Sequence, residues 1–128
     1  VSNFGESTIL VNIEAKNISK NNWEPYKFCG REKTNLNVND WINEIQKKGC
    51  GEILLTSIDK EGTETGFDIE LLESVEKIIK KPLILSGGCG NLRHIETLKK
   101  KFKNISIAIA SVLHYKKLTI SEIKKTLS

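Results

Sequence analysis

A glycine-rich segment in the second half of the chain has the composition of a phosphate-binding turn. Ser86-Gly-Gly-Cys-Gly90 follows a short apolar run and precedes a helix-forming stretch. Glycine lets the backbone turn tightly and present its N–H groups, and a helix N-terminus adds positive partial charge. The segment therefore predicts an anion site, although an ordinary glycine-rich strand-to-helix turn has the same composition.

A second segment of small residues, farther along the chain, supports this prediction. Ile107-Ala-Ile-Ala-Ser111 is an apolar run that ends in small side chains. In (β/α)8 barrels the loops after strands seven and eight often form one phosphate site. Because Gly-Gly follows one run and Ala-Ser the next, we expect the two turns to bind one phosphate. The expected binding groups are the backbone near Gly87, Gly88, Ala110 and Ser111.

The elements that position these turns alternate between short apolar runs and amphipathic stretches. The expected strands are 8–13, 52–57, 83–86 and 105–110. The expected helices begin near Asn39 or Asp40, at Asp68, after Gly90 and at the capping box Thr119-Ile-Ser-Glu122. The polar segment 16–37 is expected to be a long loop with a small hairpin. Apolar strands that alternate with amphipathic helices indicate a parallel sheet covered by helices. Four such units can be half of a (β/α)8 barrel or a small doubly wound sheet.

The composition narrows the class of protein. The 128 residues carry a net charge of +4 and only 6% aromatic residues, which argues against a nucleic-acid surface. No apolar run reaches the roughly 18 residues that span a bilayer, so we expect a soluble, cytoplasmic protein. The three cysteines are scattered without a CxxC pair, so we expect neither a metal site nor a cofactor. Residues 1–5 read as a connection into a strand, which suggests a piece of a longer polypeptide.

Four segments resemble one family over nearly the whole chain, in order and at compatible spacing. They are similar to strands five to eight, with their loops, of the cyclase subunit of imidazole glycerol phosphate synthase, an ammonia-using enzyme of histidine biosynthesis. The segments are Val11-Asn-Ile-Glu-Ala-Lys16 with Gly30-Arg-Glu-Lys-Thr34, Gly49 through Thr63 with Gly66-Phe-Asp68, Leu83 through Gly90, and Ile109 through His114. The resemblance implies that 1–128 form one domain, the C-terminal half of a phosphate-binding (β/α)8 barrel whose N-terminal half is absent.

The resemblance also implies a substrate and a reaction. The family binds a substrate with a phosphate at each end, so the half seen here would bind one phosphate and the missing half the other. Thr56 and Ser86, at strand ends, would hydrogen-bond the substrate. Ammonia from a glutaminase partner attacks, the substrate splits and an imidazole ring closes, which needs acid/base groups on both sides of the substrate.

The catalytic positions depart from the family pattern. The family carries aspartates where this chain has Glu14 and Glu61, whereas Asp59 matches the family. Each glutamate is one methylene longer, and a displacement of about 1 Å can be costly in catalysis. Glu52, which begins its strand at the opposite end, matches a glutamate of the family's ammonia gate.

Two other readings remain open because of these departures. A related barrel subunit could deliver ammonia to a sugar-amidinating enzyme of surface-polysaccharide synthesis, and a half-barrel could be non-catalytic and only assemble with partners. Of the other candidates, we expect Trp23 and Trp41 to pack, His114 to form a structural hydrogen bond and His94 to lie on a solvated helix face. The side chains toward the barrel interior would be Ile53, Leu55, Ile84 and Ile107, or their immediate neighbours.

Overall fold

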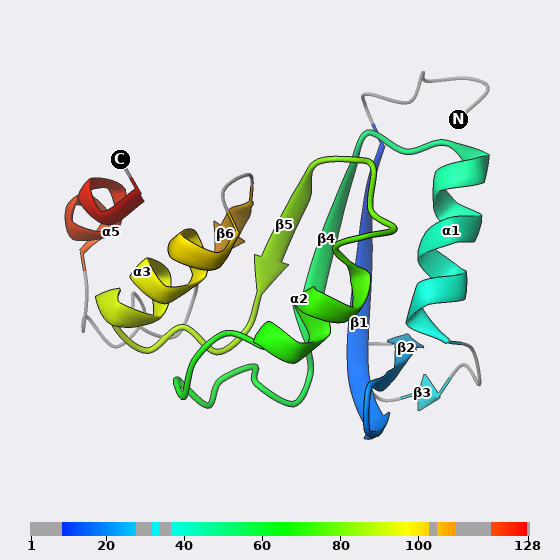
Figure 1. Cartoon of the computed structure of the whole chain (residues 1–128), viewed down its shortest axis with the longest axis horizontal. Coiled ribbons are helices and arrows are strands. Elements are labelled where there is room, and N and C mark those ends of the chain that lie inside the picture. Colours follow the sequence, from blue (N-terminus) through cyan, green and yellow to red (C-terminus); the bar gives the residue numbers. More distant parts are fainter. Residues whose placement is uncertain (1–8, 28–31, 34–36, 103–104, 110–118, 128) are drawn as a thin grey trace.

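The sheet contains four parallel strands in chain order, extended at one edge by a hairpin. A computed structural model of the chain describes residues 9–27, 32–33, 37–102, 105–109 and 119–127 (Figure 1). The strands are β1 (Leu10–Ser19), β2 (Asn22–Lys27), β3 (Glu32–Lys33), β4 (Glu52–Ser57), β5 (Leu83–Ser86) and β6 (Ser106–Ala108). Their order in the sheet is β3-β2-β1-β4-β5-β6. The helices are α1 (Val38–Lys48), α2 (Ile69–Val75), α3 (Leu92–Lys101) and α5 (Ile120–Leu127).

The parallel part of this sheet has the architecture expected for half of a (β/α)8 barrel. β1 pairs with β4, β4 with β5 and β5 with β6, each in parallel. Each strand thus lies beside the next parallel strand along the chain, which is the order that a barrel requires and a doubly wound sheet breaks. The predicted fold class is therefore confirmed.

The two faces of the sheet differ in what covers them. Ile13, Leu55 and Leu85 are at most 1% exposed and pack in one core with apolar residues of α1, α2 and α3. Because side chains alternate along a strand, their neighbours Leu54 and Ile84 lie on the opposite face, where both are only partly buried. Ile84 was therefore assigned to the correct face. For Ile53, Leu55 and Ile107 the second part of the prediction holds, because these three share the face of the helix-packed strand residues and their immediate neighbours lie on the opposite face.

Local capping signals account for most of the helix boundaries. Asp68 accepts a hydrogen bond from the backbone N–H of Leu71 at 3.1 Å, as predicted. The predicted capping box is also confirmed, because Thr119 and Glu122 exchange side-chain and backbone hydrogen bonds. The cap of α1 lies earlier than predicted. Asn37 caps this helix, and its side chain accepts from the N–H groups of Asn39 and Asp40.

Three elements differ in length from the prediction. β1 continues to Ser19 and forms an antiparallel hairpin with β2, so much of the polar segment 16–37 is strand rather than loop. α2 ends at Val75, although its apolar stripe continues to Ile79. Pro82 sets a limit to this helix, because it has no N–H for the carbonyl of Ile78. The side-chain amide of Gln46 instead donates to that carbonyl and accepts from the N–H of Lys80. β6 is shorter than predicted, and Ala110 lies outside the described residues.

Candidate active site

Polar side chains form one row across the parallel strands, at their C-terminal ends. The register places Glu14 beside Thr56, Thr56 beside Ser86 and Ser86 beside Ala108. Paired residues of neighbouring strands project from the same face, and strands lie about 4.8 Å apart. Glu14, Thr56 and Ser86 therefore lie on the face of the sheet opposite the helix-packed residues. This row brings together a carboxylate and two hydroxyl groups that the sequence had singled out.

The glycine-rich turn that follows β5 is held against the turn that follows β4. Gly87 and Gly88 have φ angles of +101° and +102°, a region that favours glycine. A Cβ on Gly88 would lie 2.0 Å from the carbonyl oxygen of Gly66, and the N–H of Gly66 donates to the Gly88 carbonyl at 2.7 Å. Glycine at position 88 is thus required by close backbone approach as well as by conformation.

A small cavity of about 40 Å³ lies at this turn. Its lining includes Glu61, Ser86, Gly87 and Gly88, together with Ala108 and Ile109 from the end of β6. The structure thus gathers one of the two candidate catalytic glutamates with two of the four predicted phosphate-binding residues and with Ser86. Glu14 does not line this cavity. The other two predicted phosphate-binding residues, Ala110 and Ser111, lie outside the described part of the chain.

The histidine of α3 has a role that the sequence analysis missed. His94 was expected on a solvated face, but it is partly buried, and its Nδ1 accepts a hydrogen bond from the N–H of Gly90 at 2.9 Å. Nδ1 must therefore be unprotonated, so the neutral ring carries its proton on Nε2. His94 fixes the end of the glycine-rich turn. A histidine four residues after the last glycine of such a turn was the available signal.

The cysteine inside the turn is chemically inactive at neutral pH. Cys89 is buried and also lines the cavity. Burial raises the pKa of its thiol from 9.0 to about 11, a backbone hydrogen bond with Asn91 opposes this rise, and the negative charge of Glu64 adds to it. Because the thiolate is the nucleophilic form, Cys89 acts as a packing residue of the turn.

Two acidic residues hold the turn that follows β4. Asp68 is buried, and its second carboxylate oxygen accepts from the hydroxyl of Ser57 at 2.6 Å. Asp59 accepts from the backbone N–H of Asn17 at 2.7 Å, which ties the turn to the end of β1. The sequence analysis had given Asp68 only a capping role. These two bonds set the position of Glu61, which lies between them and is exposed.

Glu52 lies at the other end of β4. It is exposed, it pairs in register with Leu10, and it lies four positions before Thr56, about 13 Å along the strand. The structure therefore does not bring Glu52 to the row of Glu14 and Thr56. Its role in an ammonia gate remains a prediction.

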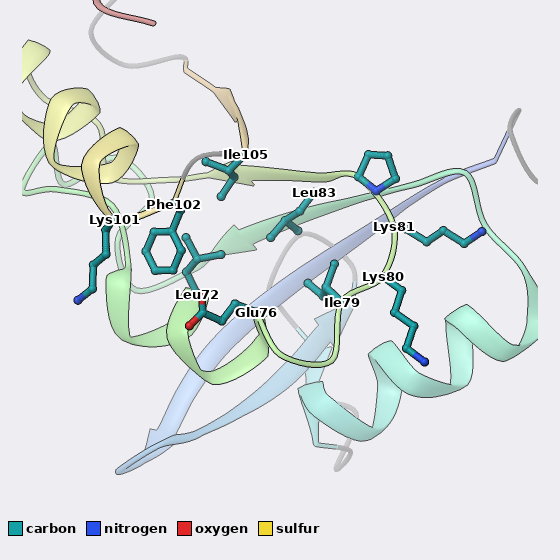
Figure 2. A pocket seen from close by; sticks show the side chains of 10 residues that line it. Leu72, Glu76, Ile79, Lys80, Lys81, Leu83, Lys101, Phe102 and Ile105 are labelled. Carbon is teal, nitrogen blue, oxygen red and sulfur yellow. The ribbon is translucent and has the colours of Figure 1, made fainter.

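A larger cavity, of about 630 Å³, also lies at this N-terminal end. Figure 2 shows its wall of apolar side chains from α2, β5 and the end of α3, with Leu72, Leu83 and Phe102 near one another. The side chains of Lys80 and Lys81 extend away from this apolar group. A binding site for a small molecule usually has a few polar groups that converge. This groove lacks such an arrangement, so we place the candidate site at the smaller cavity.

The described residues contain neither a metal-binding cluster nor a membrane-spanning helix. No three side chains of His, Cys, Asp or Glu among them come close enough to hold a metal ion. None of the helices described has the length and apolar content needed to cross a membrane.

Comparison with known proteins shows the family of the chain. A family model described as "Histidine biosynthesis protein" matches residues 1–119. Imidazole glycerol phosphate synthase subunit HisF of Prochlorococcus marinus subsp. pastoris is 44% identical over 128 residues, which cover 98% of this chain and 50% of the relative. The subunit of the same name from Nostoc sp. is 40% identical over 97% of this chain and 49% of its own length. The one from Streptococcus sanguinis is 37% identical, again over 97% and 49%. The chain spans about half the length of these curated relatives, and it belongs to the histidine biosynthesis protein family.

Proposed function

We propose that the chain is the C-terminal half of a cyclase subunit of imidazole glycerol phosphate synthase. The observation that carries this proposal is the row of Glu14, Thr56 and Ser86 beside the glycine-rich turn at the C-terminal ends of the parallel strands. In a barrel enzyme the active site lies at that end. The names of the relatives, which span about twice the length of this chain, agree with the proposal.

The glycine-rich turn would bind one phosphate of the substrate. Gly87 and Gly88 bring the backbone close to the cavity without a side chain, and α3 begins just beyond, so its N-terminus adds positive partial charge. Ala110 and Ser111 would complete this phosphate site, as predicted from the sequence. The second phosphate of the substrate would bind to the other half of the barrel.

The carboxylates would move protons while the phosphates supply binding. The proposed substrate is phosphoribulosyl-formimino-aminoimidazole carboxamide ribonucleotide, and the products are imidazole glycerol phosphate and aminoimidazole carboxamide ribonucleotide. Glu14 lies partly buried beside Thr56, where a proton can pass to or from a bound substrate. Glu61 reaches the cavity from the neighbouring turn and would act on the phosphate side of the substrate. Thr56 and Ser86 would orient the substrate between these two groups.

Ammonia would arrive from the opposite end of the sheet. Glu52 is exposed at the start of β4, and Thr56 ends the same strand at the active site. A glutaminase partner that docks at the N-terminal end of the strands would therefore release ammonia near Glu52. β4 would form one side of the path from this gate to the site.

A second candidate function rests on the two glutamates. Both candidate catalytic carboxylates are one methylene longer than in the family pattern, which would suit another acceptor. A barrel that delivers ammonia for sugar amidination is the alternative. A purely structural half-barrel is the third reading. Glu14 and Glu61 are the residues on which the three readings differ.

The test is turnover by the full-length protein with ammonium and the proposed substrate. We expect turnover, and Glu14→Gln should lower kcat by about 100-fold or more while KM changes little, because general acid–base groups contribute about 10²–10⁴-fold. Glu70→Gln, on the exposed side of α2, is the control and should have no effect. Wild-type protein without turnover, or a Glu14→Gln loss confined to KM, would contradict the proposal.

A further inference from the structure

A buried carboxylate with one unpaired oxygen lies in the described part of the hairpin, next to the active-site row. Glu24, on β2, is only 4% exposed. Its Oε2 atom is buried and has no hydrogen-bond partner among the described residues. Such a carboxylate is unfavourable, because it has lost its hydration without gaining a donor in exchange. A bound ligand that donates a hydrogen bond to this oxygen would explain why the carboxylate is buried there.

The register of the hairpin places Glu24 on the same face as the active-site row. Glu24 pairs with Lys16 and Tyr26 pairs with Glu14 across the antiparallel strands. Directly opposed residues project from one face, so Glu24 and Tyr26 share the face of Glu14. Trp23, the preceding residue, has an unpaired buried Nε1, but it projects from the opposite face and is no part of this arrangement.

The cation nearest in register does not neutralise Glu24. Lys16 is exposed, and its ammonium group lies over the ring of Tyr26, 5.7 Å from the ring centroid. The lysine is therefore engaged with the aromatic ring while the carboxylate beside it stays unpaired. The Lys16 ammonium group and the Glu24 carboxylate lie next to Glu14, and both would face a molecule bound at the row.

We propose that Glu24 is a positioning residue of the active site, whose carboxylate accepts a hydrogen bond from a hydroxyl or amide N–H group of the substrate. This inference rests on the proposed function. β2, β1, β4 and β5 are successive neighbours in the sheet, so Glu24 and Ser86 are separated by three strand spacings and by two residues along the strands, about 16 Å in all. A substrate with its phosphate at Gly87 and its reacting atoms at Glu14 would bring its next donor groups to Glu24.

The inference is tested in the full-length protein with two variants and one control. Glu24→Met keeps the length of the side chain but removes the acceptor, and it should raise KM for the proposed substrate about tenfold with a smaller change in kcat. Glu24→Gln retains one acceptor oxygen and should raise KM less. Both variants should also raise the thermal midpoint of the ligand-free protein, because an unpaired buried charge is removed. The control is Glu70→Met, which replaces an exposed glutamate on α2 and should change neither KM nor the thermal midpoint.

The outcomes separate this inference from the proposed function. An unchanged KM in an active Glu24→Met protein would overturn the role of Glu24 and leave the proposed function intact. A lower midpoint in both variants would show that Glu24 has a structural partner, and it would also overturn the inference. If Glu24→Met does not fold, KM of Glu24→Gln decides. Wild-type protein that does not turn over the substrate would remove both proposals together.

Discussion

The two ends of the parallel strands differ in cavity size and in how firmly the backbone is held. At the N-terminal end the cavity is about 630 Å³ and is lined by six apolar and four charged residues, whereas at the C-terminal end it is about 40 Å³ and lies among Glu61, Ser86 and two glycines. Chemistry needs few groups in fixed positions rather than a large volume. The smaller cavity has those groups, which is why we place the function there.

Different hydrogen bonds hold the backbone at the two ends of the strands. At the C-terminal end, Gly66 bonds to Gly88, Ser57 to Asp68, and His94 to Gly90, so the turns after β4 and β5 hold each other. At the N-terminal end, the side chain of Gln46 bonds to the backbone of the segment that follows α2 and ties that segment to α1. The hydrogen bonds at the C-terminal end position the residues of the candidate site, whereas those at the N-terminal end hold the segment after α2 against α1.

The largest expected effect comes from adding one methyl group to the glycine-rich turn. Gly88→Ala would place its Cβ 2.0 Å from the Gly66 carbonyl oxygen, in a backbone conformation that alanine rarely adopts. We expect a loss of more than about 3 kcal/mol of unfolding free energy, together with loss of phosphate binding. Denaturant unfolding and phosphate titration measure the two effects. Gly62→Ala, whose Cβ would meet nothing within 4 Å, is the control for the positive φ alone.

A substitution at the N-terminal end of the strands should lower the free energy of unfolding and leave kcat unchanged. Leu72→Ala removes a side chain that is 1% exposed and borders the large cavity. We expect a loss of about 2–3 kcal/mol, toward the low end of the usual range because the neighbouring cavity lets the site relax. In the full-length protein kcat should stay near the wild-type value. A fall in kcat without a fall in stability would show that this groove belongs to the active site.

The smallest expected effect is a pH dependence of stability that arises at Cys89. Its pKa is raised from 9.0 to about 11 in the folded chain, so the unfolded thiol loses its proton first as the pH rises. The contribution of this thiol to the free energy of unfolding is fully present below pH 9 and is lost as the pH rises through about 11. At pH 10 the loss amounts to about 1 kcal/mol. Unfolding curves at pH 7 and pH 10 should therefore differ more for wild type than for Cys89→Ala. Equal differences would show that the thiol does not contribute.

The parts of the fold that depend on local signals could be predicted from the sequence. β4 and β5 have the predicted bounds, because each is a short apolar run bounded by glycine, proline or polar residues. The caps at Asp68 and Thr119 were also predicted, since a capping side chain bonds within its own turn. The glycine-rich turn was found for the same reason.

The rest depends on contacts between distant segments. The backbone beyond α2 is held by Gln46, which is more than 30 residues away in the sequence. The polar segment after Ile13 continues as strand because β2 pairs with it, and that pairing also buries Glu24. No pattern of residue types along the chain reveals these partners. The roles of Glu14 and Glu61 came from the family resemblance, and they remain predictions.

The central claim is that the C-terminal ends of the strands bind phosphate, and a phosphate ester titration followed by amide chemical shifts tests it most directly. In the full-length protein the N–H signals of Gly87 and Gly88 should shift first and saturate together, along with those of Ala110 and Ser111. The lysines of α3, Lys99 to Lys101, are the competing anion site, and they lie at the far end of that helix from the glycine-rich turn. Shifts confined to those lysines, with the glycine signals unmoved, would contradict the claim.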